Sequence, residues 1–145
     1  MPKSPRVDPD QLLELFSVSF GAYYGDFTAA AARENLTASQ GKTLGELSRG
    51  PVAMRGLADT LACDASNITG IIDRLEKRGL VRREPSPGDR RVKNVVLTPE
   101  GEQAVEAIRA HMDTTRAGMD TLDAEERATL HALLKRVFTA RCGES

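Results

Sequence analysis

Half of the chain's 20 basic residues lie between residues 49 and 93, together with only six of its 21 acidic residues. This segment therefore carries a formal charge of +4. The rest of the chain carries −5, which gives the net charge of −1. A local excess of cations favours an anionic partner such as phosphate, although the overall pI near 6.1 conceals it. The chemistry that this segment indicates is the binding of an anion.

A helix is predicted from the turn at 63–66 to residue 78, with Gly79 as its stop residue. One face is apolar and the other is polar and basic. In a helix-turn-helix, side chains at the start of the second helix reach base edges, where Asn pairs with adenine and Arg reaches guanine or phosphate. The candidate DNA-binding residues of this helix are Ser66, Asn67, Thr69, Gly70 and Arg74. Taken alone, the same pattern also fits an ordinary amphipathic helix with a solvated face.

A β-hairpin is predicted next, with strands at 80–84 and 91–97 around a turn that contains Pro and Gly. Exposed cations at its tip contribute little to stability, but they suit the narrow minor groove of DNA. Asp89 would repel phosphate, so it either holds an arginine in a fixed pose or forms the turn as an Asx residue. The candidate DNA-binding residues of the hairpin are Asp89, Arg90, Arg91 and Lys93.

Catalytic and metal sites are not expected. Cys63 and Cys142 form no C-x-x-C pair, and His111 and His131 form no H-E-x-x-H motif. The sequence has no phosphate-binding glycine loop and no nucleophile elbow, so no enzyme activity and no cofactor are predicted. No apolar run approaches the roughly 18 residues of a membrane helix, and the N-terminus lacks the apolar block of a signal peptide. A cytoplasmic protein without a membrane partner is expected.

The remaining elements frame this middle segment. Helices are predicted at 8–34, 37–50, 54–62, 98–120 and 123–138, and a short strand at Val52 and Ala53. The fold class is mainly α with a small β-hairpin wing. It is a winged helix-turn-helix at 36–98, flanked by helices at 1–35 and 99–145, in one compact domain overall.

Residues 36–101 resemble the MarR family of transcriptional regulators. The run from Ser66 to Val81 is similar to the family's recognition helix and the strand after it. Asp89 to Arg91, followed by Val-x-Leu-Thr-x-x-Gly ending at Gly101, is similar to its wing. The resemblance implies a homodimer on a palindromic operator, usually a repressor, with dimerisation helices at 1–35 and 99–145. It also implies that Arg91 enters the minor groove and that Asp89 positions it. Many members carry Arg where this chain has Gly70, so the operator sequence is not carried over.

Five of the six aromatic residues lie in the first predicted helix. Their spacing fits core and dimer packing. A second interpretation rests on the resemblance, since many MarR proteins bind a small aromatic acid or phenolic effector. Arg55 is a candidate partner for the carboxylate of such an acid. The candidate ligand-binding residues are Phe16, Phe20, Tyr23, Tyr24 and Phe27.

Two alternatives stay open at this stage. The first is a redox-sensing regulator that uses Cys63, whose pKa a nearby helix N-terminus would lower. The second is a winged-helix protein-interaction module that does not bind DNA.

Overall fold

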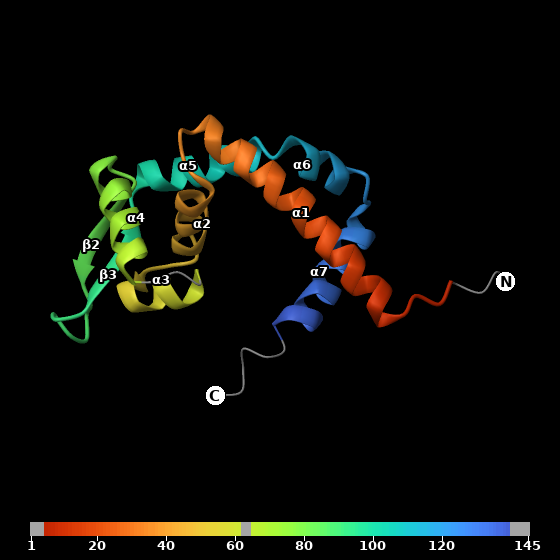
Figure 1. The fold of residues 1–145 in the computed structure, drawn as a ribbon, viewed down its shortest axis with the longest axis horizontal. Coiled ribbons are helices and arrows are strands. Elements are labelled where there is room, and N and C mark those ends of the chain that lie inside the picture. The colour runs from red at the N-terminus through yellow and green to blue at the C-terminus, as the bar shows by residue number, and fades with distance from the viewer. Residues whose placement is uncertain (1–4, 62–64, 140–145) are drawn as a thin grey trace. The chain divides into compact units, whose positions relative to one another are not determined.

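The computed structural model describes residues 5–61 and 65–139, and for Ala65 and Ser66 it describes the backbone alone. The chain divides into two compact units, Met1–Met112 and Asp113–Ser145. The elements in chain order are α1 (Pro9–Arg33), α2 (Ala38–Leu47), β1 (Val52–Ala53), α3 (Met54–Thr60), α4 (Ala65–Lys77), β2 (Val81–Pro85), β3 (Lys93–Leu97), α5 (Pro99–Ala110), α6 (Asp113–Asp120) and α7 (Ala124–Phe138) (Figure 1). The mainly helical fold with a small β wing is confirmed.

Both ends of α1 are defined by local hydrogen bonds. Asp8 accepts a hydrogen bond from the Gln11 amide at 2.8 Å, the Gln11 side chain accepts from the Asp8 amide at 3.0 Å, and Pro9 occupies the first turn. At the other end, Asn35 adopts a positive φ of 56°, and the Leu36 amide donates to the Ala31 carbonyl. The predicted range of 8–34 is therefore confirmed.

The first unit has one apolar core, to which α1 to α5 and the sheet all contribute. Thr43 is the fully buried polar residue of α2, and its hydroxyl donates to the Ser39 carbonyl at 2.8 Å. The largest fully buried apolar side chains are Leu44, Leu57, Ile68, Ile72, Leu75, Val81 and Val95.

The three strands form an antiparallel sheet in the order β1-β3-β2. Val95 lies opposite Val52 on one side and Arg83 on the other. The last strand begins at Lys93 rather than at residue 91, because the segment before it forms a turn in which the Val92 amide donates to the Asp89 carbonyl at 3.0 Å. We use the name wing for residues 81–97.

The single helix predicted at 98–120 is wrong, because it is interrupted at His111 and Met112. The His111 amide still donates to the Ala107 carbonyl, but Met112 is buried in the core of the first unit, and a new helix starts at Asp113. An acidic residue in the first turn favours such a start.

In the second unit, Asp123 and Glu126 form a reciprocal capping box at the start of α7. Within the single chain, Leu133, Val137 and Phe138 of this helix are between 45% and 59% exposed. The helix thus carries an apolar surface that the described part of one chain leaves uncovered.

Candidate nucleic-acid interface and adjoining pocket

Helix α4 has the two faces that the sequence predicted. Ile68, Ile72 and Leu75 are buried, whereas Asn67, Thr69 and Arg74 are exposed. A Cβ atom added at Gly70 would meet no atom within 4 Å, so the surface is open at that position. Ser66 belongs to α4, but its side chain lies outside the described residues. The exposed face therefore presents an amide, a hydroxyl and a guanidinium along one helix.

The tip of the wing is built around Asp89. Its carboxylate accepts a hydrogen bond from the main-chain amide of Arg91 at 2.9 Å, and the Ser86 amide donates to the Val92 carbonyl at 2.8 Å. This is the geometry of an Asx turn, so Asp89 fixes the backbone from which Arg91 projects. Arg90, Arg91 and Lys93 are exposed. The tip therefore offers three cations on a hydrogen-bonded turn.

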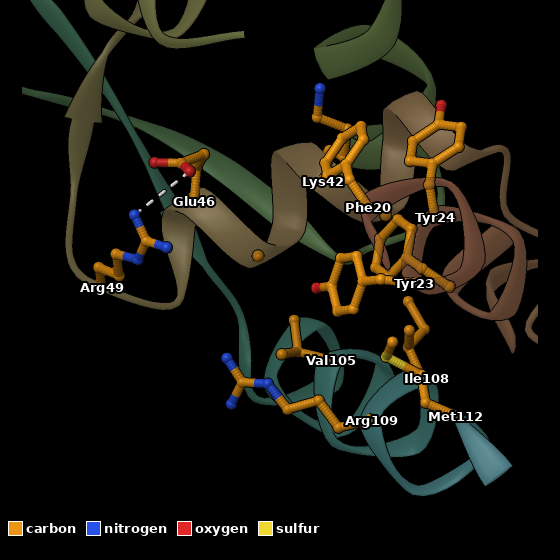
Figure 2. Close-up of a pocket in the computed structure, with 13 residues that line it drawn as sticks. Phe20, Tyr23, Tyr24, Lys42, Glu46, Arg49, Val105, Ile108, Arg109 and Met112 are labelled. Atoms are coloured by element: carbon orange, nitrogen blue, oxygen red, sulfur yellow. Dashed lines mark hydrogen bonds and ion pairs between the residues drawn. The ribbon is translucent and has the colours of Figure 1, made fainter. Parts of the chain in front are cut away.

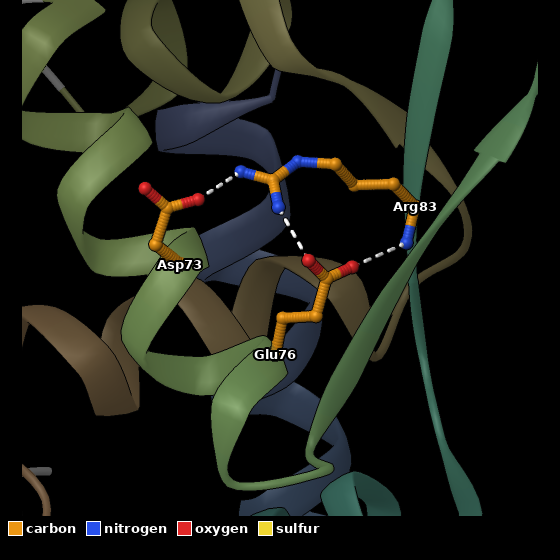
Figure 3. Close-up of polar contacts among 3 residues, drawn as sticks. All are labelled: Asp73, Glu76 and Arg83. Atoms are coloured by element: carbon orange, nitrogen blue, oxygen red, sulfur yellow. Dashed lines mark hydrogen bonds and ion pairs between the residues drawn. The ribbon is translucent and has the colours of Figure 1, made fainter.

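Arg83 joins the wing to α4, and the sequence analysis did not single it out (Figure 3). Its Nη2 lies 2.5 Å from Asp73 Oδ1, its Nη1 lies 2.6 Å from Glu76 Oε1, and its main-chain amide donates to Glu76 Oε2 at 3.2 Å. The hydrogen bond to Asp73 raises the pKa of the Arg83 guanidinium, against a smaller opposing effect of burial. Both carboxylates therefore favour the charged form of Arg83.

Several cations of the basic segment bind acceptors within the protein. Arg78 donates to the carbonyls of Glu34 and Asn35, and Arg82 pairs with Glu84 at 2.7 Å. With Arg83, and with Arg49 at 3.4 Å from Glu46, four of its ten basic residues therefore have partners within the protein. Two acidic residues of α4, Asp73 and Glu76, are correspondingly neutralised in part by Arg83.

A pocket of about 420 Å³ lies between α1, α2 and α5, all within the first unit (Figure 2). The rings of Phe20 and Tyr24 stack at 6.0 Å, and those of Tyr23 and Phe27 at 6.3 Å. These four aromatic residues were predicted as ligand-binding, and they line the pocket. The other residues that line it are Gly41, Lys42, Gly45, Glu46, Arg49, Val105, Ile108, Arg109 and Met112.

Two residues considered for this site are not among those that line the pocket. Phe16 lies farther toward the start of α1, and Arg55 lies on α3. The cations of the pocket are Lys42, Arg49 and Arg109, which the sequence analysis did not identify. No sequence signal pairs these three residues with the aromatic stripe, because only the packing of α2 and α5 against α1 brings them together.

The polar groups of the pocket are unevenly distributed. Figure 2 shows the Tyr23 hydroxyl directed toward the side on which the Arg49 and Arg109 guanidinium groups lie. Arg49 Nη1 is 3.4 Å from Glu46 Oε1, and Arg109 Nη2 is 3.4 Å from the Ser48 hydroxyl. Three cations and one carboxylate give the pocket a net positive lining, next to aromatic walls.

The remaining candidates for chemistry are the two cysteines and the two histidines. Cys63 and Cys142 are outside the described residues. His111 Nε2 lies 3.7 Å from Glu34 Oε1, and His131 is exposed on α7. Among the residues that the structure describes, no group of His, Cys, Asp and Glu is arranged to hold a metal ion, and no helix could span a membrane.

The fold and the two exposed elements define a winged helix-turn-helix protein. Residues 36–93 match the model of the MarR family. The HTH-type transcriptional repressor NicR of Pseudomonas putida is 32% identical over 137 residues, which cover 93% of this chain and 87% of NicR.

Two solved structures are similar to this chain in fold. A mutant of Escherichia coli MarR in complex with operator DNA is 28% identical, with a TM-score of 0.63, over 88% of this chain and 93% of that one. Bordetella bronchiseptica BpsR, whose DNA binding is regulated by 6-hydroxynicotinic acid, is 27% identical, with a TM-score of 0.63, over 88% and 98%. The chain belongs to the MarR family. It is a DNA-binding transcriptional regulator rather than an enzyme.

Proposed function

We propose that this regulator is a homodimeric repressor that binds a palindromic operator and releases it when a small aromatic acid occupies the pocket between α1, α2 and α5. The observation that carries this proposal is the pocket itself, which combines aromatic walls with three cations in the same unit as α4. Two relatives support this proposal, since NicR is a transcriptional repressor and the DNA binding of BpsR is regulated by 6-hydroxynicotinic acid.

The DNA-binding roles follow from where each side chain lies. Asn67, Thr69 and Arg74 would contact base edges and phosphates in the major groove, since they occupy the exposed face of α4. Arg90, Arg91 and Lys93 would reach the adjacent minor groove and its phosphates from the tip of the wing. A dimer would present two such surfaces to the two half-sites of a palindrome.

The proposed effector is a compound with one aromatic ring and one carboxylate. The ring would stack against Phe20 and Tyr23, and the carboxylate would pair with Arg109 or Arg49. A hydroxyl on the ring would suit the Tyr23 hydroxyl, which points toward the same side. Salicylate and 6-hydroxynicotinate are therefore suitable probes.

Helix α2 would transmit the binding event. It lines the pocket with Lys42 and Glu46, and it also packs against α4. A ligand shifts an equilibrium only by its differential affinity for two states. The proposed ligand would favour a spacing of the two α4 helices that does not match the operator, and by reciprocity operator DNA would weaken ligand binding.

The experiment is an operator titration with and without each probe, for the parent and for variants of the pocket. Gly45→Leu fills the pocket from α2, at a position where an added Cβ meets no atom within 4 Å. Arg109→Gln removes a cation, and Arg116→Gln on α6 is the matched control. We expect the probes to lower the operator affinity of the parent and the control, and to have little effect on the two pocket variants.

Other results would favour the alternatives. A probe response that is the same in Gly45→Leu and Arg109→Gln as in the parent would show that the pocket is not the effector site. Release of DNA by peroxide in the parent but not in Cys63→Ser would indicate a redox switch. Absence of any salt-dependent binding to genomic DNA would indicate a protein-interaction module.

A further inference from the structure

Arg83 forms ion pairs with two acidic residues of a neighbouring element. Its side chain is 25% exposed, and its two terminal nitrogens bind two different carboxylates. Both carboxylates belong to α4, whereas Arg83 belongs to β2 and lies opposite Val95 of β3. Arg83 therefore bridges the two elements that DNA would contact, the helix and the wing (Figure 3).

We propose that Arg83 is a positioning residue for DNA binding, which fixes the spacing between α4 and the wing and partly neutralises Asp73 and Glu76. The proposal rests on the assignment of α4 and the wing as the DNA-binding surface. It does not depend on the effector or on the dimer.

The first part of the argument concerns charge. Asp73 follows Thr69 by four residues and directly precedes Arg74, and its side chain is 60% exposed. A free carboxylate at this place would face the phosphates of a bound duplex. The two carboxylates alone carry a formal charge of −2, and together with Arg83 the group carries −1. Arg83 thereby weakens the repulsion between these carboxylates and the DNA phosphates. The two acidic residues of α4 therefore oppose DNA binding less than two free carboxylates would.

The second part concerns geometry. A planar guanidinium can bind two carboxylates in fixed directions, which the single ammonium of a lysine cannot do. The main-chain amide of Arg83 adds a third hydrogen bond, to Glu76 Oε2. A helix in the major groove and a wing in the minor groove bind together only if their spacing matches the DNA. A spacing that is fixed before binding lowers the entropic cost of the complex.

The competing interpretation is that Arg83 binds a phosphate directly. The two interpretations differ in the salt dependence of binding. In an Asp73→Asn/Glu76→Gln background, where neither carboxylate is left to repel phosphate, loss of one phosphate contact lowers the slope of log affinity against log salt by about one, whereas loss of a positioning residue leaves it unchanged. They also differ in whether the effect of Arg83 depends on its two carboxylate partners.

The experiment measures operator affinity and its salt slope for Arg83→Met in the parent and in an Asp73→Asn/Glu76→Gln background. We expect Arg83→Met to lower the affinity of the parent about tenfold, equivalent to ~1.4 kcal/mol, and to leave the salt slope unchanged in the Asp73→Asn/Glu76→Gln background. In the Asp73→Asn/Glu76→Gln background the same substitution should change the affinity less than twofold. Arg83→Lys should retain part of the affinity, because it keeps the charge and loses the two-carboxylate geometry.

Two outcomes would overturn the proposal. One is a loss of affinity of the same size in both backgrounds, and the other is a salt slope that falls by about one when Arg83→Met is made in the Asp73→Asn/Glu76→Gln background. If Arg83→Met does not fold, Arg83→Lys and the background variants give the same comparison. A parent protein that binds no DNA would instead contradict the proposed function, so the two failures are distinguishable.

Discussion

Arg78, just after the end of α4, donates a hydrogen bond from Nη1 to the carbonyl oxygen of Asn35, at a distance of 2.7 Å. Its Nη2 donates to the Glu34 carbonyl at 3.0 Å. These two carbonyls close the C-terminal end of α1, where a cation is favourable to the helix dipole. Arg78 thus joins α1, which lines the pocket, to the end of α4, the helix that we propose contacts bases.

The Arg78 contact predicts a loss of stability. We expect Arg78→Ala to lower the free energy of unfolding by about 1 kcal/mol, because two charge-assisted hydrogen bonds are lost at an exposed position. Lys77→Ala, one residue earlier, is the control, and it should leave the stability nearly unchanged. Urea titration of both variants measures the difference. Equal stabilities would mean that the Arg78 hydrogen bonds contribute nothing.

Gly101 is predicted to be intolerant of any side chain. A Cβ atom there would lie 2.1 Å from the Leu80 carbonyl oxygen, which also accepts a hydrogen bond from the Thr98 amide. We expect Gly101→Ala to destabilise the protein by about 2 kcal/mol or more, since the helix start must move away from the wing. Gly118→Ala on α6 is the control, because its Cβ would meet nothing within 4 Å. A Gly101→Ala variant as stable as Gly118→Ala would contradict the close approach.

The exposed apolar residues of α1 predict self-association. Leu13 and Val18 are 67% and 66% exposed in the single chain. A homodimer would cover them, so sedimentation at micromolar concentration should give twice the chain mass. Leu13→Lys with Val18→Lys should shift the protein toward monomer, whereas Asp59→Lys on α3 should not. A parent protein that sediments as a monomer would refute both the dimer and the palindromic operator.

Asn67 and Arg91 should differ in what they contribute to DNA binding. Arg91→Ala should weaken binding to all sequences and lower the salt slope by about one, because the contact is electrostatic. Asn67→Ala should relax the preference at one base position per half-site, at a cost of roughly 1–3 kcal/mol. Binding assays on the operator and on single-base variants separate the two effects. An Arg91→Ala protein that binds as tightly as the parent at moderate salt would contradict the role of the wing.

The sequence predicted elements whose signals are local. Asp8 and Pro9 indicate the start of α1, and the capping boxes of α2 and α7 each span four consecutive residues. The glycine of the Val-x-Leu-Thr-x-x-Gly pattern has a physical reason in the approach of Gly101 to Leu80. The break before α6 was not predicted, because no Gly or Pro stands at His111 or Met112 to mark the end of a helix.

The site was predicted in part, and the missing part depends on tertiary packing. The exposed face of α4 follows from helical periodicity. The partners of Arg83 instead depend on how β2 lies against α4. From the sequence alone, Arg83 is one of ten basic residues in the basic segment, and nothing indicates its partners. Likewise, the aromatic stripe of α1 was visible, but Arg109 joins it only through the packing of α5 against α1.

The most direct test of the account is a hydroxyl-radical footprint of the protein on a genomic fragment that it selects. We expect two protected half-sites about one helical turn apart, with minor-groove protection beside each. Arg91→Ala should lose the minor-groove protection and keep the protection of the backbone beside the major groove that α4 enters in each half-site. A single protected site, or a footprint that Arg91→Ala leaves unchanged, would contradict a dimeric winged-helix reader of DNA.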